Sequence, residues 1–271
     1  MPELTIVIVS YNTRDHLAAC LRSLHEPPPA VGHDIVVVDN ASSDGSEEAA
    51  RAWPEVRVIQ SGANLGFAKA NNLGIRASAG EFVLLLNSDA VVPPGAVDAL
   101  VADLRAHPDA AIVGPRIVDG HGVPEISFGR MIGPLVELRR KHLMHAYAQR
   151  RPGAVRRVSR MLAREGHHDW VSGACLLARR SAAEEVGLFD ERYFMYNEDV
   201  DFCAAIRARG HKVRFTPSVE IVHHRGRSVA TNRPAVSAAY RQSQIAFYEK
   251  HRPAWVPLLK AYLRAKGLSP D

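Results

Sequence analysis

The apolar stretch at residues 82–86 (FVLLL) is followed at once by Asn87-Ser88-Asp89. A continuous apolar run of this length is typical of a strand that is covered on both faces of an α/β sheet. Such sheets bind ligands beyond the carboxyl ends of their strands. A carboxylate at that position, with no Lys or Arg beside it, suits a hard divalent cation that holds phosphate oxygens. Taken alone, the stretch is explained slightly better by an Asx turn in which Asp89 caps backbone amides.

The segments around this run alternate between strand patterns and helix patterns. Strands are expected at 4–10, 34–38, 56–59, 82–86 and 110–114, and helices are expected to start near 13, 43 and 64, the last running to about 79. This order predicts an α/β fold with a mostly parallel central sheet, right-handed crossovers and flanking helices.

The alternation fails beyond Gly120, where longer helical segments are expected. Residues 131–165 are expected to form a basic helical insertion, a lid or acceptor region. Further strands are expected at 170–179, 213–215 and 221–223, with a helix at 197–209. Two amphipathic helices, broken at Pro253 and Pro257, should follow from Pro234. With no internal repeat or low-complexity linker, we expect one domain over 1–232 and a helical tail at 233–271.

Length and composition are those of an ordinary globular protein. The chain has 271 residues, of which 46% are hydrophobic and 23% charged, enough for one large α/β domain or two small ones. No apolar run approaches the roughly 20 residues that span a bilayer, and the N-terminus does not resemble a signal peptide. Cys20, Cys175 and Cys203 are odd in number and far apart. We therefore expect a cytoplasmic protein with reduced thiols.

Charge is distributed unevenly along the chain. Residues 1–110 carry 7 Lys/Arg and 14 Asp/Glu, a balance of −7, which leaves 27 Lys/Arg and 15 Asp/Glu, a balance of +12, for residues 111–271. Residues 139–164 contain nine basic side chains and no acid. This segment either binds an anion, such as membrane lipid or a phosphorylated acceptor, or is a solvated helix face. Nucleic acid is the least favoured partner, because no aromatic residues for base stacking are interleaved with the charges.

Polar residues follow the predicted strands at four places: 10–12 (SYN), 39–40 (DN), 64–67 (NLGF) and 87–89 (NSD). Since the carboxyl ends of parallel strands share one sheet edge, these side chains should meet there and contact a base and ribose. Each one alone is explained by helix capping, which is favoured for Asp44. The chain has neither a G-x-G-x-x-G nor a P-loop motif, which disfavours a dinucleotide fold or a P-loop.

Two further clusters carry titratable side chains. Glu198, Asp199 and Asp201 begin a predicted helix, where acids are favoured by the helix dipole. The preceding aromatic residues would place them at the rim of a pocket, where desolvation raises the pKa of a carboxylate toward that of a useful base. Residues 223–228 (HHRGRS) combine paired histidines with two arginines, which can supply a metal ligand and a diphosphate clamp. Surface histidines without a ligand are an alternative of about equal weight.

With these residues considered together, the chain closely resembles family 2 glycosyltransferases, which are inverting enzymes of the GT-A fold, and among them the bacterial rhamnosyltransferase-like members. The resemblance covers roughly residues 4–230, and the ordered set of motifs is highly specific. The matching segments are IVIVSYN (6–12), VVVDNASSDGS (36–46), NLGFAKANNLGI (64–75), VLLLNSDA (83–90), WVSGA (170–174), GLFDERYFMYNEDVDFCAAIRARG (187–210) and HHRGRS (223–228).

The resemblance implies a role for individual residues around a nucleotide-sugar donor. Asp89 would be the metal-binding acid of the family's D-x-D motif, in which Asn87 replaces the first Asp, and His223 would be its partner on Mg²⁺ or Mn²⁺. Asp199 would be the general base, and Glu198 would orient the acceptor. The acceptor side would be lined by Trp170, Gly173 and Ala174. Donor-binding residues would be Ser10, Asn12, Asp39, Asn64, Gly66, Lys69, Asn87, Ser88, Arg225 and Arg227.

The resemblance also implies the substrates, and two rival functions stay open. The donor would be dTDP-rhamnose, with UDP-hexoses second, and the acceptor a glycan or lipid-linked glycan in cell-surface polysaccharide synthesis. The basic segment and the tail could contact anionic lipid at the inner membrane face, or the tail could pack on the domain or on a second copy in a homodimer. A sugar-phosphate nucleotidyltransferase would need a Gly-rich loop after the first strand, where residues 11–14 (YNTR) contain no glycine. A non-catalytic scaffold of a polysaccharide assembly complex is the other rival.

Overall fold

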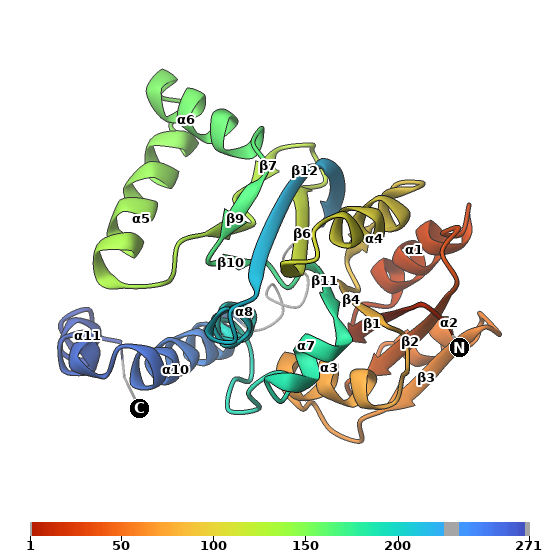
Figure 1. The fold of residues 1–271 in the computed structure, drawn as a ribbon. Coiled ribbons are helices and arrows are strands. Elements are labelled where there is room, and N and C mark those ends of the chain that lie inside the picture. Colours follow the sequence, from red (N-terminus) through yellow and green to blue (C-terminus); the bar gives the residue numbers. More distant parts are fainter. Residues whose placement is uncertain (1, 225–232, 269–271) are drawn as a thin grey trace.

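A computed structural model describes residues 2–224 and 233–268, with the side chains of 233–236 excepted. Figure 1 shows a central sheet with the N-terminal strands on one side of the molecule and the helices α5, α6, α10 and α11 on the other. The expected α/β fold with a mostly parallel central sheet and flanking helices is confirmed. Arg225 and Arg227 are not among the described residues, so the diphosphate contacts expected of them lie outside the part of the chain that the structure describes.

The N-terminal half is the parallel part of the sheet, in the order β3-β2-β1-β4. Every pairing within it is parallel, as the β-α alternation predicts. Its strands are β1 (Leu4–Ser10), β2 (His33–Asp39), β3 (Val56–Gln60) and β4 (Phe82–Asn87), and its helices are α1 (Arg14–His25), α2 (Ser46–Arg51) and α3 (Gly66–Arg76). α3 ends about one turn earlier than expected, because Gly80 N turns away to donate to Thr5 Oγ1 on β1.

The sheet continues through β11, β6, β12 and β5, and here directions are mixed. β11 is antiparallel to both β4 and β6, whereas β6 and β12 are parallel. The elements are β5 (Ala90–Val91), α4 (Ala96–Ala106), β6 (Ala110–Val118), β7 (Pro124–Glu125), β8 (Phe128–Gly129), β9 (Gly166–His168), β10 (Trp170–Val171), β11 (Cys175–Arg179), α7 (Arg180–Glu185), α8 (Glu198–Ala208) and β12 (Lys212–His223).

The bounds of three expected strands were wrong. Residues 170–179 form two strands, because the chain turns at Ser172, whose N–H donates to Ser127 O, and β10 pairs with β8 in a separate small sheet. Residues 213–215 and 221–223 belong to one strand, β12, whose register shifts between Thr216 and Glu220. Pro217 lies in this interval, and a proline cannot donate to a β-ladder, which accounts for an irregular stretch there.

Apolar side chains cover the sheet on both faces. One face packs against α1 and α4 through residues such as Leu17, Leu21 and Leu100. The other face packs against α3 and α8, with Ile75, Phe202 and Ile206 among the buried side chains. Because both faces are covered, the functional groups at the strand ends are held by a rigid framework. The three cysteines are buried free thiols.

Four longer helices lie beyond the sheet: α5 (Pro134–Ala148), α6 (Pro152–Leu162), α10 (Arg233–His251) and α11 (Val256–Ala265), with a 3₁₀ turn η1 (Pro253–Trp255). The tail packs on the domain, since Phe247 of α10 and Leu263 of α11 belong to the same core cluster as β-strand residues. Pro257 was expected to break a helix but stands in the first turn of α11, where the missing N–H costs no hydrogen bond. Within the described chain, no helix combines the length and apolar character needed to cross a membrane.

Candidate active site

The carboxyl ends of the parallel strands bring the polar residues together, as expected from the sequence. Ser10 and Asp39 are register partners on β1 and β2. Asn40 Nδ2 donates to Asn64 Oδ1 over 3.0 Å, and Asn40 Oδ1 accepts from Leu65 N over 2.9 Å. These bonds link the end of β2 to the start of α3 and hold Asn64 at the same edge as β1.

Asn12 and Asp39 shape the turn that follows β2. Ser43 N donates to Asn12 Oδ1 over 2.8 Å, and Ser42 N donates to Asp39 Oδ2 over 3.0 Å. The other carboxylate oxygen, Asp39 Oδ1, is buried and has no hydrogen-bond partner among the described residues. A buried acceptor without a partner is costly, so this atom is well suited to receive a hydroxyl or N–H of a ligand.

Capping explains some of the remaining polar residues. Asp44 accepts hydrogen bonds from Arg14 N and from Ser46 N, over 2.9 and 3.0 Å, so the capping role favoured for it from the sequence is present. Ser10 and Ser88 are joined through the Thr13 hydroxyl, over 3.0 and 2.9 Å. This buried hydroxyl chain fixes the ends of β1 and β4 relative to each other.

Asp89 lies beside His223, from the far end of the sequence. His223 Nε2 is 3.1 Å from Asp89 Oδ1 and 3.1 Å from Asn87 Nδ2. Pairing of β5 with the end of β12 produces this meeting, because His223 is the register partner of Ala90. Burial raises the pKa of Asp89, but the hydrogen bond and charge of His223 outweigh burial and leave that pKa below its ordinary value. Burial lowers the pKa of His223, but Asp89 and Glu125 together raise it to about 9.

These groups fit a divalent cation that is shared with a substrate. Carboxylate oxygen suits Mg²⁺ and Mn²⁺, and Mg²⁺ is usually held by one or two protein side chains together with substrate phosphates and water. Among the described residues, no group of three or more His, Cys, Asp or Glu side chains is arranged to hold a metal ion by itself. Asp89 and His223 could therefore supply only part of a coordination shell, and a substrate or water would have to supply the remaining ligands.

The Glu198-Asp199 pair lies at the start of α8. Gly173 N donates to Asp199 Oδ2 over 2.9 Å, while Glu198 Oε2 is buried with no hydrogen-bond partner among the described residues. Desolvation raises the pKa of Asp199 against the opposing effect of its backbone hydrogen bonds. Burial, and next the charge of Asp199, raise the pKa of Glu198 well above its ordinary value. Raised pKa values of this kind are typical of groups that exchange protons near neutral pH.

Residues 194–199, called the acidic turn below, include two residues in an uncommon backbone conformation. Tyr196 and Asn197 have φ values of +71° and +65°, which side chains other than glycine adopt only at a cost. The Asn197 side-chain nitrogen Nδ2 is buried without a hydrogen-bond partner among the described residues. Strained backbone together with unpaired buried polar atoms is characteristic of functional sites.

Short contacts connect this acidic turn to the strand ends. Asp199 accepts from Gly173 N, and the next residue, Ala174, accepts from Asn87 N over 3.0 Å. On the other side, Phe67 N at the start of α3 donates to Phe194 O over 2.7 Å. Gly66 allows this approach, because a Cβ there would lie 2.3 Å from Phe194 O. The predicted donor side and the predicted acidic turn therefore converge on one region.

Trp170 and Lys69 have surroundings different from those of the strand-end residues. Trp170 is buried, and its Nε1 donates to Arg130 O over 3.0 Å. The guanidinium carbon of Arg140, on α5, lies 5.9 Å from the Trp170 ring centre. Lys69 is exposed on α3, where its charge helps to lower the pKa of Glu191 after stronger effects from Asn72 and Arg76.

Two residues of this region were not singled out from the sequence. Glu125 was not named at all, and Arg140 was not distinguished from the other basic residues of its segment. Glu125 Oε2 lies 3.9 Å from His223 Nδ1. It stands in the two-residue strand β7, where no hydrophobic period or motif marks it. Arg140 was one of nine basic residues in the 139–164 segment, and only the packing of α5 across Trp170 distinguishes it from the others.

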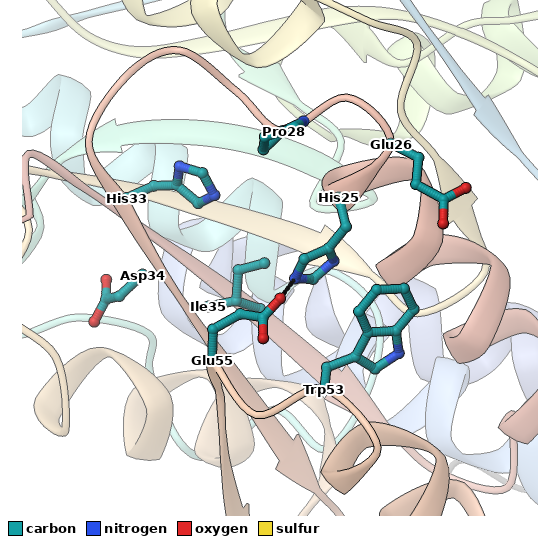
Figure 2. A pocket seen from close by; sticks show the side chains of 8 residues that line it. All are labelled: His25, Glu26, Pro28, His33, Asp34, Ile35, Trp53 and Glu55. Atoms are coloured by element: carbon teal, nitrogen blue, oxygen red, sulfur yellow. Dashed lines mark ion pairs between the residues drawn. The ribbon is translucent and has the colours of Figure 1, made fainter.

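A separate hollow of 440 Å³ lies between α1, β2 and β3, lined by His25, Trp53 and Glu55 among others. Figure 2 shows His25 beside Glu55, with which it forms a 2.9 Å ion pair, and beside the Trp53 ring, 4.3 Å away between centroids. Its lining comes from His33 to Ile35 at the amino end of β2 and from Glu55, just before β3. It therefore lies at the opposite end of these strands from the polar cluster.

Comparison with known proteins points to one family. The model of glycosyl transferase family 2 matches residues 5–187. An N-acetylglucosaminyl-diphospho-decaprenol L-rhamnosyltransferase of Mycobacterium tuberculosis is 35% identical over 268 residues, covering 93% of this chain and 86% of that protein. The low-salt glycan biosynthesis hexosyltransferase Agl10 of Haloferax volcanii is 27% identical over 238 residues, covering 83% of this chain and 68% of that protein.

A solved structure shares the fold. The mannosyltransferase PcManGT of Pyrobaculum calidifontis, in complex with GDP-Man and Mn²⁺, superposes with a TM-score of 0.63 at 20% identity, over 96% of this chain and 69% of that one. At this identity the likeness concerns the fold.

Proposed function

The chain belongs to glycosyl transferase family 2 and has the GT-A fold, and on this premise we propose that it is an inverting, metal-dependent transferase that moves rhamnose from dTDP-rhamnose to a lipid-linked glycan. The relative of 35% identity is named for rhamnosyl transfer to a lipid-linked N-acetylglucosaminyl diphosphate, which supports this choice of substrates. The single observation that carries the proposal is the convergence of Asp199 and the end of β4 through Gly173 and Ala174.

The donor would lie across the strand ends. Asp39 Oδ1 is a buried acceptor without a hydrogen-bond partner among the described residues, available to a ribose hydroxyl or a base N–H. Ser10, Asn12, Asn64 and Gly66 would contribute to the same donor site. Asn87, Ser88 and Asp89 would face the diphosphate, together with Lys69, Arg225 and Arg227. Asp89 and His223 would hold Mg²⁺ or Mn²⁺, and the bound cation would offset negative charge on the departing nucleoside diphosphate.

The acceptor would enter from the side of Trp170, Gly173 and Ala174. Asp199 would accept the proton of the acceptor hydroxyl, and the freed oxygen would attack the anomeric carbon from the face opposite the leaving group. The raised pKa of Asp199 increases its basicity when it is ionised. Glu198 Oε2, buried and unpaired, would orient the acceptor.

The domain division proposed from the sequence follows the same roles. Residues 1–232 would form the catalytic domain, in which 131–165 is an insertion on the acceptor side, and 233–271 would be a helical tail packed upon it. A lipid-linked acceptor would bring the protein to the inner face of the membrane, where the basic 139–164 segment would meet anionic lipid.

Product formation from a panel of donors tests the proposed activity. The wild-type protein is incubated with Mn²⁺, a lipid-linked N-acetylglucosaminyl diphosphate, and dTDP-rhamnose, UDP-hexoses or GDP-mannose in turn. We expect rhamnosyl product with inverted anomeric configuration from dTDP-rhamnose. Donor binding without transfer from any donor would favour the scaffold, and diphosphate release from a nucleoside triphosphate and a sugar phosphate would favour a nucleotidyltransferase.

The metal site is tested separately by calorimetry of donor binding to Asp89→Ala. Binding of dTDP-rhamnose by the wild type should be stronger with Mn²⁺ than without it, because the cation joins the protein to the diphosphate. The variant should bind the donor with the same affinity in both conditions. A full Mn²⁺ effect in Asp89→Ala would contradict the assignment.

A further inference from the structure

A cavity of 800 Å³ lies between α5, α10 and α11, next to the acidic turn. Most of its lining side chains are aliphatic or aromatic, and three of them, Trp255, Leu258 and Tyr262, are 42%, 58% and 50% exposed. An apolar hollow of this size is within the ~300–1,000 Å³ range of pockets that enclose small organic molecules. We call it the α5–α11 cavity, and nothing in the proposed transfer reaction has yet used it.

The cavity adjoins the proposed catalytic residues. Tyr196 lines it, and this residue precedes Asn197 and Glu198 in the chain. The Tyr196 and Tyr240 rings lie 5.6 Å apart between centroids, which places α10 against the acidic turn. Asn197 Nδ2 and Glu198 Oε2, both buried without a hydrogen-bond partner among the described residues, lie next in the chain.

Basic groups lie in the wall of the cavity and near the acids. Arg140 lies over Trp170 and is close enough to Asp199 to oppose the effect of burial on its pKa. Lys141 and Arg241 line the cavity itself, and Arg241 Nε is buried without a hydrogen-bond partner among the described residues. None of the nine basic residues in 139–164 forms an ion pair with a described residue. Cationic groups beside an apolar hollow suit a ligand with an anionic head and a hydrocarbon chain.

Polar contacts between α5 and α10 join three of the residues that line the cavity. Gln244 Nε2 and Tyr248 OH, both on α10, donate to the two carboxylate oxygens of Glu137 on α5, over 3.0 and 2.8 Å. The polar groups of Glu137, Gln244 and Tyr248 are thus hydrogen-bonded to one another, and most of the remaining lining is apolar. A flat bilayer surface would contact a convex apolar face, whereas a hollow encloses a single chain.

We propose that the α5–α11 cavity receives the first part of the hydrocarbon chain of a lipid-linked acceptor, with the acceptor diphosphate at Arg140, Lys141 and Arg241. Because Tyr196 lines the cavity and lies two residues before Glu198, the sugar attached to that diphosphate would lie at Glu198 and Asp199. This proposal rests on the proposed function, because it assigns the lipid part of the same acceptor. It also explains why the tail packs on the catalytic domain but leaves Leu258 and Tyr262 open.

Two leucines of α5 provide a matched pair for the test. Leu138 lines the cavity and is 52% exposed, whereas Leu135, one turn earlier, is 64% exposed and outside the lining. Binding of farnesyl diphosphate and of inorganic diphosphate is measured by calorimetry. The wild type should bind farnesyl diphosphate at least tenfold more tightly than inorganic diphosphate. Leu138→Glu should lose most of that difference, because it introduces a charge into the apolar wall, and Leu135→Glu should keep it.

A second variant tests the anionic end of the site. Arg140→Gln should weaken binding of both probes by roughly tenfold, equivalent to ~1.4 kcal/mol. Equal affinity of the wild type for the two probes, an unchanged preference in Leu138→Glu, or unchanged binding in Arg140→Gln would each overturn the proposal. So would loss of liposome binding in both leucine variants with farnesyl diphosphate binding intact, since that result identifies a bilayer contact.

Transfer assays separate this proposal from the proposed function. With acceptors that share a sugar diphosphate and differ in chain length, Leu138→Glu should lower kcat/KM roughly tenfold for the long chain and leave the short chain unchanged. If the wild type transfers no sugar from any donor, the proposed function fails while the probe-binding result still decides whether the cavity takes a hydrocarbon chain.

Discussion

Replacement of Glu198 by glutamine should stabilise the folded protein at pH 8. The Glu198 side chain is 6% exposed, and its Oε2 has no hydrogen-bond partner among the described residues. Burial, followed by the charge of neighbouring Asp199, raises the pKa of Glu198 well above its ordinary value of 4.5. An ionised carboxylate at this position is therefore a source of instability, which glutamine removes with little change in shape.

The size of the effect follows from the unpaired oxygen. A buried polar group without a partner costs about 1–3 kcal/mol, and a charged group costs more. Removal of the charge should therefore raise the free energy of unfolding by about 1–3 kcal/mol at pH 8. For a protein of this size each kcal/mol shifts Tm by roughly 2–4 °C, so the Tm should rise by roughly 2–12 °C.

The pH dependence gives the prediction its sign. Because the pKa of Glu198 is raised in the folded state, its contribution to stability is fully present below the unfolded pKa and is lost as pH rises through the folded pKa. The gain of Glu198→Gln over the wild type should thus be largest at pH 8 and shrink as the pH falls toward 4.5.

Thermal unfolding followed by circular dichroism across this pH range measures the effect. Glu81→Gln serves as the control, because Glu81 is exposed and such changes stay within about 0.5 kcal/mol. A variant no more stable than the wild type at pH 8, or a gain that grows as the pH falls, would refute the reasoning. Transfer activity should fall in the same variant, since glutamine orients an acceptor hydroxyl differently.

Urea denaturation checks two further predictions. Gly66→Ala should lower the free energy of unfolding by roughly 1–3 kcal/mol or more, because φ is +79° and the new Cβ would lie 2.3 Å from Phe194 O. Gly62→Ala is the control, with φ +75° and no atom within 4 Å of its Cβ, and it should lower that free energy less. Equal losses in the two variants would contradict the steric argument. Arg214→Ala should cost about 3–5 kcal/mol, because the 6% exposed Arg214 side chain pairs with two acids. Arg57 forms a 3.8 Å ion pair with Asp34 at the surface, so Arg57→Ala should lower the free energy of unfolding by only about 0–1 kcal/mol. A loss as large as that of Arg214→Ala would count against the explanation by burial.

The parallel half of the fold could be predicted because its signals are local. Strands β1, β2 and β4 each contain a continuous apolar run, whereas Arg57 interrupts β3, and polar residues mark where all four strands end. Parallel strands share one carboxyl edge, so the meeting of Asp39, Asn64 and Asn87 followed without knowledge of any long-range contact. Asp199 was located by its motif, and its hydrogen bond to Gly173 became visible only in the structure.

The remaining features depend on contacts between distant segments. Residues 170–179 are mostly apolar and were predicted to form one strand, and the pairing of β10 with β8 accounts for the break at Ser172. Glu125 approaches His223 because β7 folds back on β6. The turn between these strands is marked by Asp119-Gly120, but no local pattern shows that His223 lies beside it. The apolar residues of the tail were recognised, but the α5–α11 cavity arises from the position of α5, which buries no residue of its own.

The most direct test of the central claim is the initial rate of rhamnosyl transfer by Asp199→Asn, measured at saturating dTDP-rhamnose and Mn²⁺ with donor affinity determined in parallel. Asparagine keeps the shape of the side chain and can still accept from Gly173 N, but it cannot take a proton from the acceptor. The rate should fall by ~10²–10⁴-fold while donor affinity stays that of the wild type. A rate equal to that of the wild type would contradict the account.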